Sequence, residues 1–156
     1  MSGDAEMIKL YSQRILALAS DIPHHTRLSD WDGQATKRSP LCGSTVTVEL
    51  RLKAGRIAAF GQDVKACALG QASAAVSGAE ILGRTEDEVA AARDQLRAML
   101  KSDGPVPDAP FGGFEVLAPA KDYKNRHASI LLTLEATLAA FEAARLGAGE
   151  TLSTAP

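Results

Sequence analysis

The sequence predicts an α+β domain in which a small antiparallel three-stranded sheet packs against helices. Residues 45–53 alternate between apolar and polar side chains, and the turn-forming pair Ala54-Gly55 follows them directly. Later segments change to the three- and four-residue spacing of buried helix faces. At 156 residues the chain is long enough for one continuous core. We expect residues 1–148 to form a single domain and residues 149–156 to be a disordered tail.

The first half of the chain should contain one helix and the three strands. An amphipathic helix is expected from about Met7 to Leu18, with Ile15 on its buried stripe. Residues 34–38 form a short edge strand, and residues 56–64 form the second strand of the hairpin. Between them, the strand at 45–53 should bury one set of side chains and leave a polar set in water. The expected buried set is Val46, Val48, Leu50 and Leu52, and the polar set is Thr45, Thr47, Glu49, Arg51 and Lys53.

The second half should be helical. One helix opens at Cys67 and ends at Leu82-Gly83, and its many Ala, Ser and Gly residues let another element approach its backbone. Residues 85–88 match a capping box that starts the next helix. Residues 101–120 are rich in proline and glycine, so we expect a long connection that Phe111 and Phe114 pin to the core. The final helix runs from about residue 122 to 145.

Composition narrows the class of protein. The formal net charge is −2 and the basic residues are not clustered, which argues against nucleic acid or an anionic membrane as partner. No apolar run approaches the ~20 residues of a transmembrane helix. The N-terminus lacks the basic-then-apolar order of a secretory signal. We therefore expect a cytoplasmic protein whose thiols are reduced.

Two cysteines flank the predicted hairpin. Cys67 stands where a strand ends and a helix begins, and the helix N-terminus stabilises a thiolate there. Cys42 lies in a loop between Pro40 and Gly43, where backbone amides can reach a metal-bound sulfur. Either cysteine taken singly also fits a small buried hydrophobic residue. The hairpin can return the chain so that the two sulfurs meet.

His127 lies in the first turn of the last helix, in register with Leu131 and Leu134. That position fits a satisfied core histidine, and it also fits a ligand, because the neutral imidazole binds metals. Two thiolates and an imidazole suit Zn²⁺ or an iron–sulfur cluster. No C-x-x-C motif, P-loop, G-x-S-x-G or H-E-x-x-H is present, so the spacing points to no particular enzyme.

The segments around the cysteines resemble the IscU/SufU/NifU N-terminal family of iron–sulfur cluster assembly scaffolds. The resemblance is carried by Pro40-Leu41-Cys42-Gly43-Ser44, by Cys67 opening an Ala/Ser-rich helix, and by Arg126-His127-Ala128-Ser129-Ile130-Leu131. It extends from about Met7 to Arg145, and it implies the SufE/NifU-like fold.

Two positions depart from the family. Its aspartate after C-G is Ser44 here, and its third cysteine, which the family uses for ligation and sulfur transfer, is Ala128. Carried over by position, the resemblance implies that Cys42, Cys67 and His127 hold iron or a labile cluster, with zinc in the isolated protein. The change at Ser44 is compatible with tighter holding of the cluster and with weaker metal entry.

The resemblance implies a binding and transfer protein and not an enzyme. Its partners would be a cysteine desulfurase and iron–sulfur acceptor proteins. Two alternatives stay open. A SufE-like sulfur acceptor would carry persulfide on one thiol, with Cys67 favoured by thiolate character and Cys42 by loop exposure. An interaction protein without this chemistry would keep only the fold.

Overall fold

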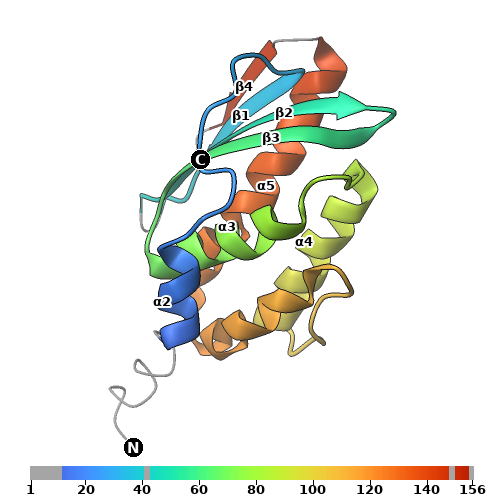
Figure 1. The fold of residues 1–156 in the computed structure, drawn as a ribbon. Helices are drawn as coiled ribbons and strands as arrows, with labels where there is room; N and C mark the ends of the chain where they lie inside the picture. The colour runs from blue at the N-terminus through green and yellow to red at the C-terminus, as the bar shows by residue number, and fades with distance from the viewer. Residues whose placement is uncertain (1–11, 41–42, 148–149, 155–156) are drawn as a thin grey trace, which may run out of the picture.

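The strands form one sheet in the order β3-β2-β1-β4. The computed structural model describes residues 12–40, 43–147 and 150–154. β1 (Gly33–Arg38), β2 (Thr45–Lys53) and β3 (Arg56–Lys65) pair antiparallel, which confirms the predicted three-stranded sheet. β4 (Glu150–Thr154) pairs parallel with β1 at the edge of the sheet. Helices pack on one face of the sheet (Figure 1).

The strand β4 lies within residues 149–156, for which the sequence analysis expected a disordered tail. Its register pairs Gly33 with Glu150 and Lys37 with Thr154. A sheet edge presents a row of unpaired N–H and C=O groups, and a returning chain can satisfy them with its backbone alone. Backbone pairing of this kind leaves no apolar pattern in the sequence. The described sheet therefore extends beyond the boundary that we placed at residue 148.

The hairpin turn has the predicted conformation. Ala54 and Gly55 have φ angles of 53° and 77°, as a type I′ turn requires at both central positions. On β2, Val46, Val48 and Leu50 of the expected apolar set are buried, whereas Leu52, near the turn, is only half-buried. The polar face is not wholly in water, because Glu49 is only 1% exposed. The segment before β1 crosses this face, and the Leu28 N–H donates to the Glu49 carboxylate at 2.8 Å.

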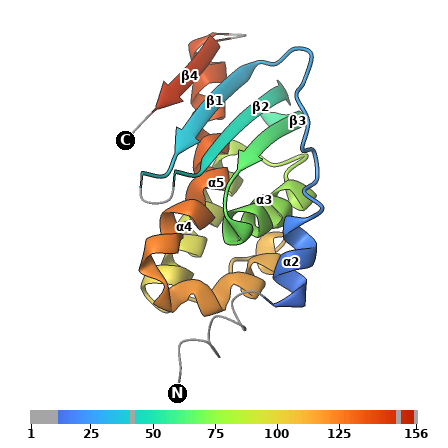
Figure 2. The same ribbon diagram turned by 90° about the vertical axis from the view of Figure 1, so that its left-hand side faces the viewer.

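Among the described residues, four α-helices complete the fold. They are α2 (Gln13–Ala19), α3 (Ala68–Glu80), α4 (Glu86–Lys101) and α5 (Lys124–Leu146). α5 contacts β1, β2, α3 and α4, so it joins the sheet to the helical half of the molecule (Figures 1 and 2). These helices confirm the helices that we predicted from the spacing of apolar residues. Residues 7–11 of the first predicted helix lie outside the described residues. No helix among the described residues is long and apolar enough to span a membrane.

Small residues let α5 approach its neighbours closely. A Cβ atom on Gly33 of β1 would lie 2.0 Å from the Ala140 carbonyl oxygen, so only glycine fits there. On α3, a Cβ atom on Gly70 would lie 2.6 Å from the Ser129 hydroxyl. The Ser73 hydroxyl of α3 donates to the Ile130 carbonyl at 2.5 Å. The thin α3 helix therefore packs directly against the N-terminal half of α5, as its composition predicts.

The proline- and glycine-rich connection is more regular than expected. Its second half forms the 3-10 helix η1 (Phe111–Asp122), and both Phe111 and Phe114 are buried. A buried segment must satisfy its own backbone polar groups, and 3-10 turns do this within the segment.

The predicted capping box at the start of α4 is present, since the Thr85 hydroxyl accepts from the Glu88 N–H at 3.2 Å.

Candidate functional site

Cys67 occupies the junction between β3 and α3. It is the N-cap residue of α3, with extended backbone angles of φ −67° and ψ 170°. Its side chain makes no capping hydrogen bond to the helix. Instead the sulfur lies 3.6 Å from the Ser129 hydroxyl oxygen of α5. The thiol is free of any disulfide and half-buried, so a reactant or a metal ion can reach it.

Two buried serines continue from this sulfur. The Ser129 hydroxyl oxygen lies 3.1 Å from the hydroxyl oxygen of Ser44, which directly precedes β2. Ser129 and Ser44 are 1% and 3% exposed. We call these three side chains the Ser44–Ser129–Cys67 cluster. It joins the start of β2, the start of α3 and the first half of α5 at one point.

The predicted partner Cys42 lies outside the described residues. The strands on either side of it are described, and the end of β1 and the start of β2 lie at the end of the sheet where β3 leads into Cys67. Thr45 of β2 pairs with Arg38 on one side and with Lys65 on the other. The loop that contains Cys42 joins the first pair, and Cys67 comes two residues after Lys65. A meeting of the two thiols stays a prediction that this strand register supports.

His127 is not beside Cys67. Its ring Nε2 lies 2.9 Å from the Ala120 carbonyl oxygen of η1, and the residue is 2% exposed. His127 and Ser129 are two residues apart, which is about 200° around a helix. Since Ser129 faces Cys67, the imidazole points to the opposite side of α5. Ala128, at the position of the family's third cysteine, lies between them and is half-buried.

The described side chains do not form a complete metal site by themselves. Within residues 12–40, 43–147 and 150–154, no three His, Cys, Asp or Glu side chains lie close enough to hold a metal ion. The cluster offers one thiol and two hydroxyls. Any metal site at Cys67 therefore needs further ligands from the segment of Cys42, from a rearranged α5 or from a partner.

Ser129 was not singled out from the sequence as a site residue. One feature of the sequence could have indicated that Ser129 has a polar partner. A serine interrupts the apolar stripe of the last helix, next to Ile130 and two residues after His127. Buried serine hydroxyls in a helix usually have a hydrogen-bond partner. The identity of that partner depends on the packing of α5 against α3, which the sequence does not show.

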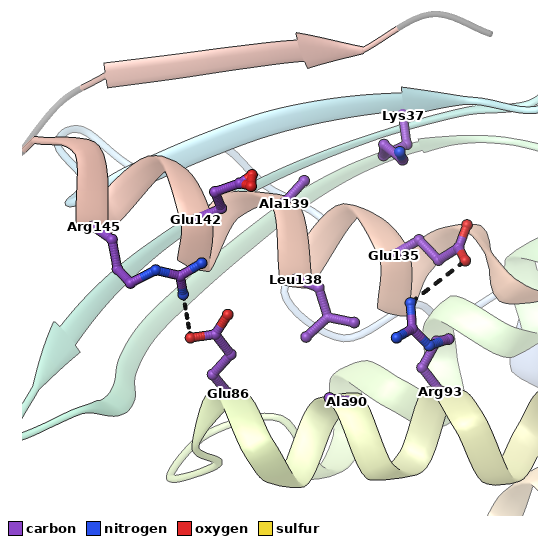
Figure 3. Close-up of a pocket in the computed structure, with 9 residues that line it drawn as sticks. All are labelled: Lys37, Glu86, Ala90, Arg93, Glu135, Leu138, Ala139, Glu142 and Arg145. Carbon is purple, nitrogen blue, oxygen red and sulfur yellow. Dashed lines mark hydrogen bonds and ion pairs between the residues drawn. The ribbon is translucent and has the colours of Figure 1, made fainter.

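A separate groove lies between α4 and the C-terminal half of α5. It has a volume of about 410 Å³, and Figure 3 shows that charged side chains surround Leu138 in it. Ion pairs cross the groove, from Arg145 to Glu86 and from Arg93 to Glu135. The groove shares no residue with the cluster. The ion pairs therefore link α4 to α5, and the groove is a separate feature from the site around Cys67.

The fold and the Ser44–Ser129–Cys67 cluster together define a class of protein. It is a small α+β domain in which an antiparallel hairpin and a helix N-terminus present a thiol beside a long C-terminal helix. No known protein-family profile matches the chain, and no curated protein sequence does.

Solved structures do match. A nitrogen-fixing NifU-like protein (N-terminal) from Brucella abortus is 42% identical with a TM-score of 0.87, over 90% of this chain and 98% of that one. The chain therefore belongs to the NifU-like N-terminal family. A candidate iron–sulfur cluster assembly scaffold protein for the SUF system from Fervidobacterium islandicum is 20% identical, with a TM-score of 0.76 over 86% and 98% of the two chains. A hypothetical protein is 19% identical, with a TM-score of 0.73 over the same shares. The last two likenesses concern the fold alone.

Proposed function

We propose that this protein is an iron–sulfur cluster assembly scaffold that binds iron or a labile cluster and passes it to acceptor proteins. One observation carries the proposal. In a chain of the NifU-like N-terminal family, Cys67 is a half-buried thiol at a helix N-terminus, at the end of the sheet where β1 ends and β2 begins. Thiolates at such positions suit iron, zinc and cluster sulfide.

Cys42 and Cys67 are the proposed thiolate ligands, and His127 is the proposed third ligand. The imidazole can join only if the first turns of α5 rearrange, because it lies on the side of α5 opposite to Ser129, which faces Cys67. The backbone carbonyl oxygen that Nε2 contacts only accepts hydrogen bonds, so Nε2 carries the proton and Nδ1 of the neutral ring holds the lone pair. Because residue 128 is alanine and not a third cysteine, a bound iron–sulfur cluster would have incomplete protein ligation. Such a cluster is suited to transfer.

The proposed cargo determines the partners. A cysteine desulfurase would supply sulfur, and iron–sulfur acceptor proteins would receive the cluster. In this role the protein binds and transfers its cargo and catalyses no reaction of its own. The same ligands would accept Zn²⁺ in the isolated protein, since thiolate and imidazole are zinc ligands.

Anaerobic reconstitution with iron, sulfide and a cysteine desulfurase tests this function. The wild-type protein should gain cluster absorption and bound iron. Cys42→Ala and Cys67→Ala should each lose both signals. Ser73→Ala is the matched control, because it removes a buried hydrogen bond of α3 without touching either thiol. Full cluster loading in both cysteine variants would exclude the proposed ligands.

One observation favours a second candidate, a SufE-like sulfur acceptor. A persulfide acceptor needs one accessible thiol, and the described residues contain such a thiol but no three-ligand metal site. The Cys67 thiolate would attack the outer sulfur of the donor persulfide. The new S–S bond would form on Cys67, and the donor thiolate would leave. Mass spectrometry that finds persulfide on one cysteine, with no bound metal, would favour this candidate.

A further inference from the structure

We propose that Ser44 and Ser129 form a hydrogen-bond relay to the Cys67 sulfur. In this relay the Ser44 hydroxyl donates to Ser129, and the Ser129 hydroxyl donates to the sulfur. The relay would lower the electron donation from that sulfur to an electrophile or a metal ion. The metal-binding part of this inference rests on the proposed function. The relay itself belongs to the metal-free protein and can be tested there.

The geometry supplies an unbroken chain of polar atoms. The Cys67 sulfur lies 3.6 Å from the Ser129 hydroxyl oxygen, which lies 3.1 Å from the Ser44 hydroxyl oxygen. Both serines are buried, so bulk water does not compete for their protons. Cys67 makes no capping bond to α3, and among the described residues the Ser129 hydroxyl is the hydrogen-bonding group that lies against its sulfur.

The chemistry of the three groups determines the direction of the bonds. A thiolate carries no proton and only accepts, whereas each serine hydroxyl carries one proton and also accepts. When Cys67 is a thiolate, Ser129 must therefore direct its proton to the sulfur. The Ser129 oxygen is then left to accept the proton of Ser44. By this bond Ser44 acts on Cys67 through Ser129.

A serine at position 44 is important for this direction. A carboxylate there would only accept, and it would compete with the sulfur for the single proton of Ser129. The hydroxyl of Ser44 can donate instead, so the Ser129 proton stays with Cys67. Hydrogen bonds to a sulfur ligand are one of the factors that set the reduction potential of a cluster. The relay would therefore adjust the proposed site from a residue that is not a ligand.

The metal-free test uses a single-thiol protein, Cys42→Ser, and the neutral reagent iodoacetamide. Alkylation of Cys67 is timed at a pH at which the thiolate absorbance has reached its maximum, so that only nucleophilicity differs. Ser129→Ala should react about tenfold faster, the ratio that corresponds to one lost hydrogen bond to a charged group. Ser44→Ala should cause a smaller increase. The double variant should match Ser129→Ala, since Ser44 acts through Ser129.

Ser73→Ala is the control for loosened packing. Like Ser129→Ala it removes a buried serine hydroxyl between α3 and α5, but this hydroxyl donates to the Ile130 carbonyl and not to the sulfur. Its alkylation rate should equal that of the parent. An equal acceleration in Ser73→Ala, or an unchanged rate in Ser129→Ala, would overturn the relay. If Ser129→Ala fails to fold, Ser44→Ala decides the question by its own rate.

Cobalt(II) provides the metal-binding readout in the protein with both cysteines. Sulfur-to-cobalt charge transfer should shift to longer wavelength in Ser129→Ala, because a sulfur without a hydrogen bond donates electrons more readily. An unshifted band would count against the relay. A failure of wild-type protein to bind cobalt would count against the proposed function, and the alkylation rates would still decide the relay.

Discussion

The Nε2 atom of His127 lies 2.9 Å from the Ala120 carbonyl oxygen, on the side of α5 that is turned away from Cys67. This contact gives the ring a structural role in the metal-free protein, because it supplies the Ala120 carbonyl with a second donor beside the Tyr123 N–H. A ligand role would use Nδ1, and it would require the ring to move toward the side of α5 that faces Cys67. The two roles therefore make opposite demands on one side chain, and substitutions can separate them.

His127→Ala should lower the free energy of unfolding of the metal-free protein by about 0.5–1.5 kcal/mol, since one hydrogen bond is lost while the Ala120 carbonyl still accepts from the Tyr123 N–H. His127→Gln keeps an amide donor and should recover part of this loss. Urea denaturation measures both. If His127 also binds metal, added zinc should raise the unfolding temperature of wild type more than that of His127→Gln. An equal increase would leave the ring with its structural role only.

Ala128→Cys should strengthen metal binding. Residue 128 is half-buried on α5, between His127 and Ser129, and a thiol there would add a third sulfur ligand to the proposed site. We expect at least about a tenfold gain in zinc affinity, measured by competition with a chelator, since each added thiolate ligand contributes several kcal/mol at best and part is lost to strain. Ala139→Cys, farther along the same helix, is the control and should show no gain. Equal affinities in both variants would place the metal elsewhere.

Glu49 should make stability depend on acidity. Burial by itself would raise the pKa of Glu49, but hydrogen bonds from Arg27, Leu28 and Gln34 outweigh burial and hold this pKa below its ordinary value of 4.5. A folded-state pKa that is depressed contributes stability above the unfolded-state pKa. That contribution is lost as the pH falls through the folded-state value.

Glu49→Gln should therefore be less stable than wild type at neutral pH, by about 1–3 kcal/mol for the hydrogen bonds to a buried charge. The difference should shrink as the pH falls below 4.5, the ordinary value for this carboxyl group. Urea denaturation at several pH values between neutral and acidic measures it. A difference that stays constant down to the acid limit would show that Glu49 is not the titrating group.

Gly33→Ala should strongly destabilise the fold. The added Cβ would lie 2.0 Å from the Ala140 carbonyl oxygen, and this backbone atom cannot move without shifting α5 from the sheet. We expect a loss of at least about 1–3 kcal/mol in the free energy of unfolding. Gly112→Ala is the matched control, because nothing lies within 4 Å of its added Cβ. Similar losses in the two variants would contradict the close contact between β1 and α5.

Local patterns predicted the elements well. The alternation at Thr45–Lys53 predicts the bounds of β2 correctly, and the Thr85 capping box starts α4 as expected. Both signals depend on neighbours within a few residues. The exposure of Glu49 was mispredicted because period-two alternation identifies the two faces of a strand but not what covers the second face. Here the segment that contains Arg27 covers it, 22 residues away in sequence.

The candidate site shows the same division. The sequence by itself determined where Cys67 falls, at a strand-to-helix junction, and which residues of the family pattern are replaced, at Ser44 and Ala128. Only the tertiary structure decided that Ser129 contacts Cys67 across 62 residues and that His127 turns to Ala120. The physical reason is that helix periodicity predicts which face of α5 is buried but not which neighbour each buried side chain meets. That choice follows from how closely α3 and η1 pack against α5, and the glycine and serine contacts of α3 set that distance only once the chain has folded.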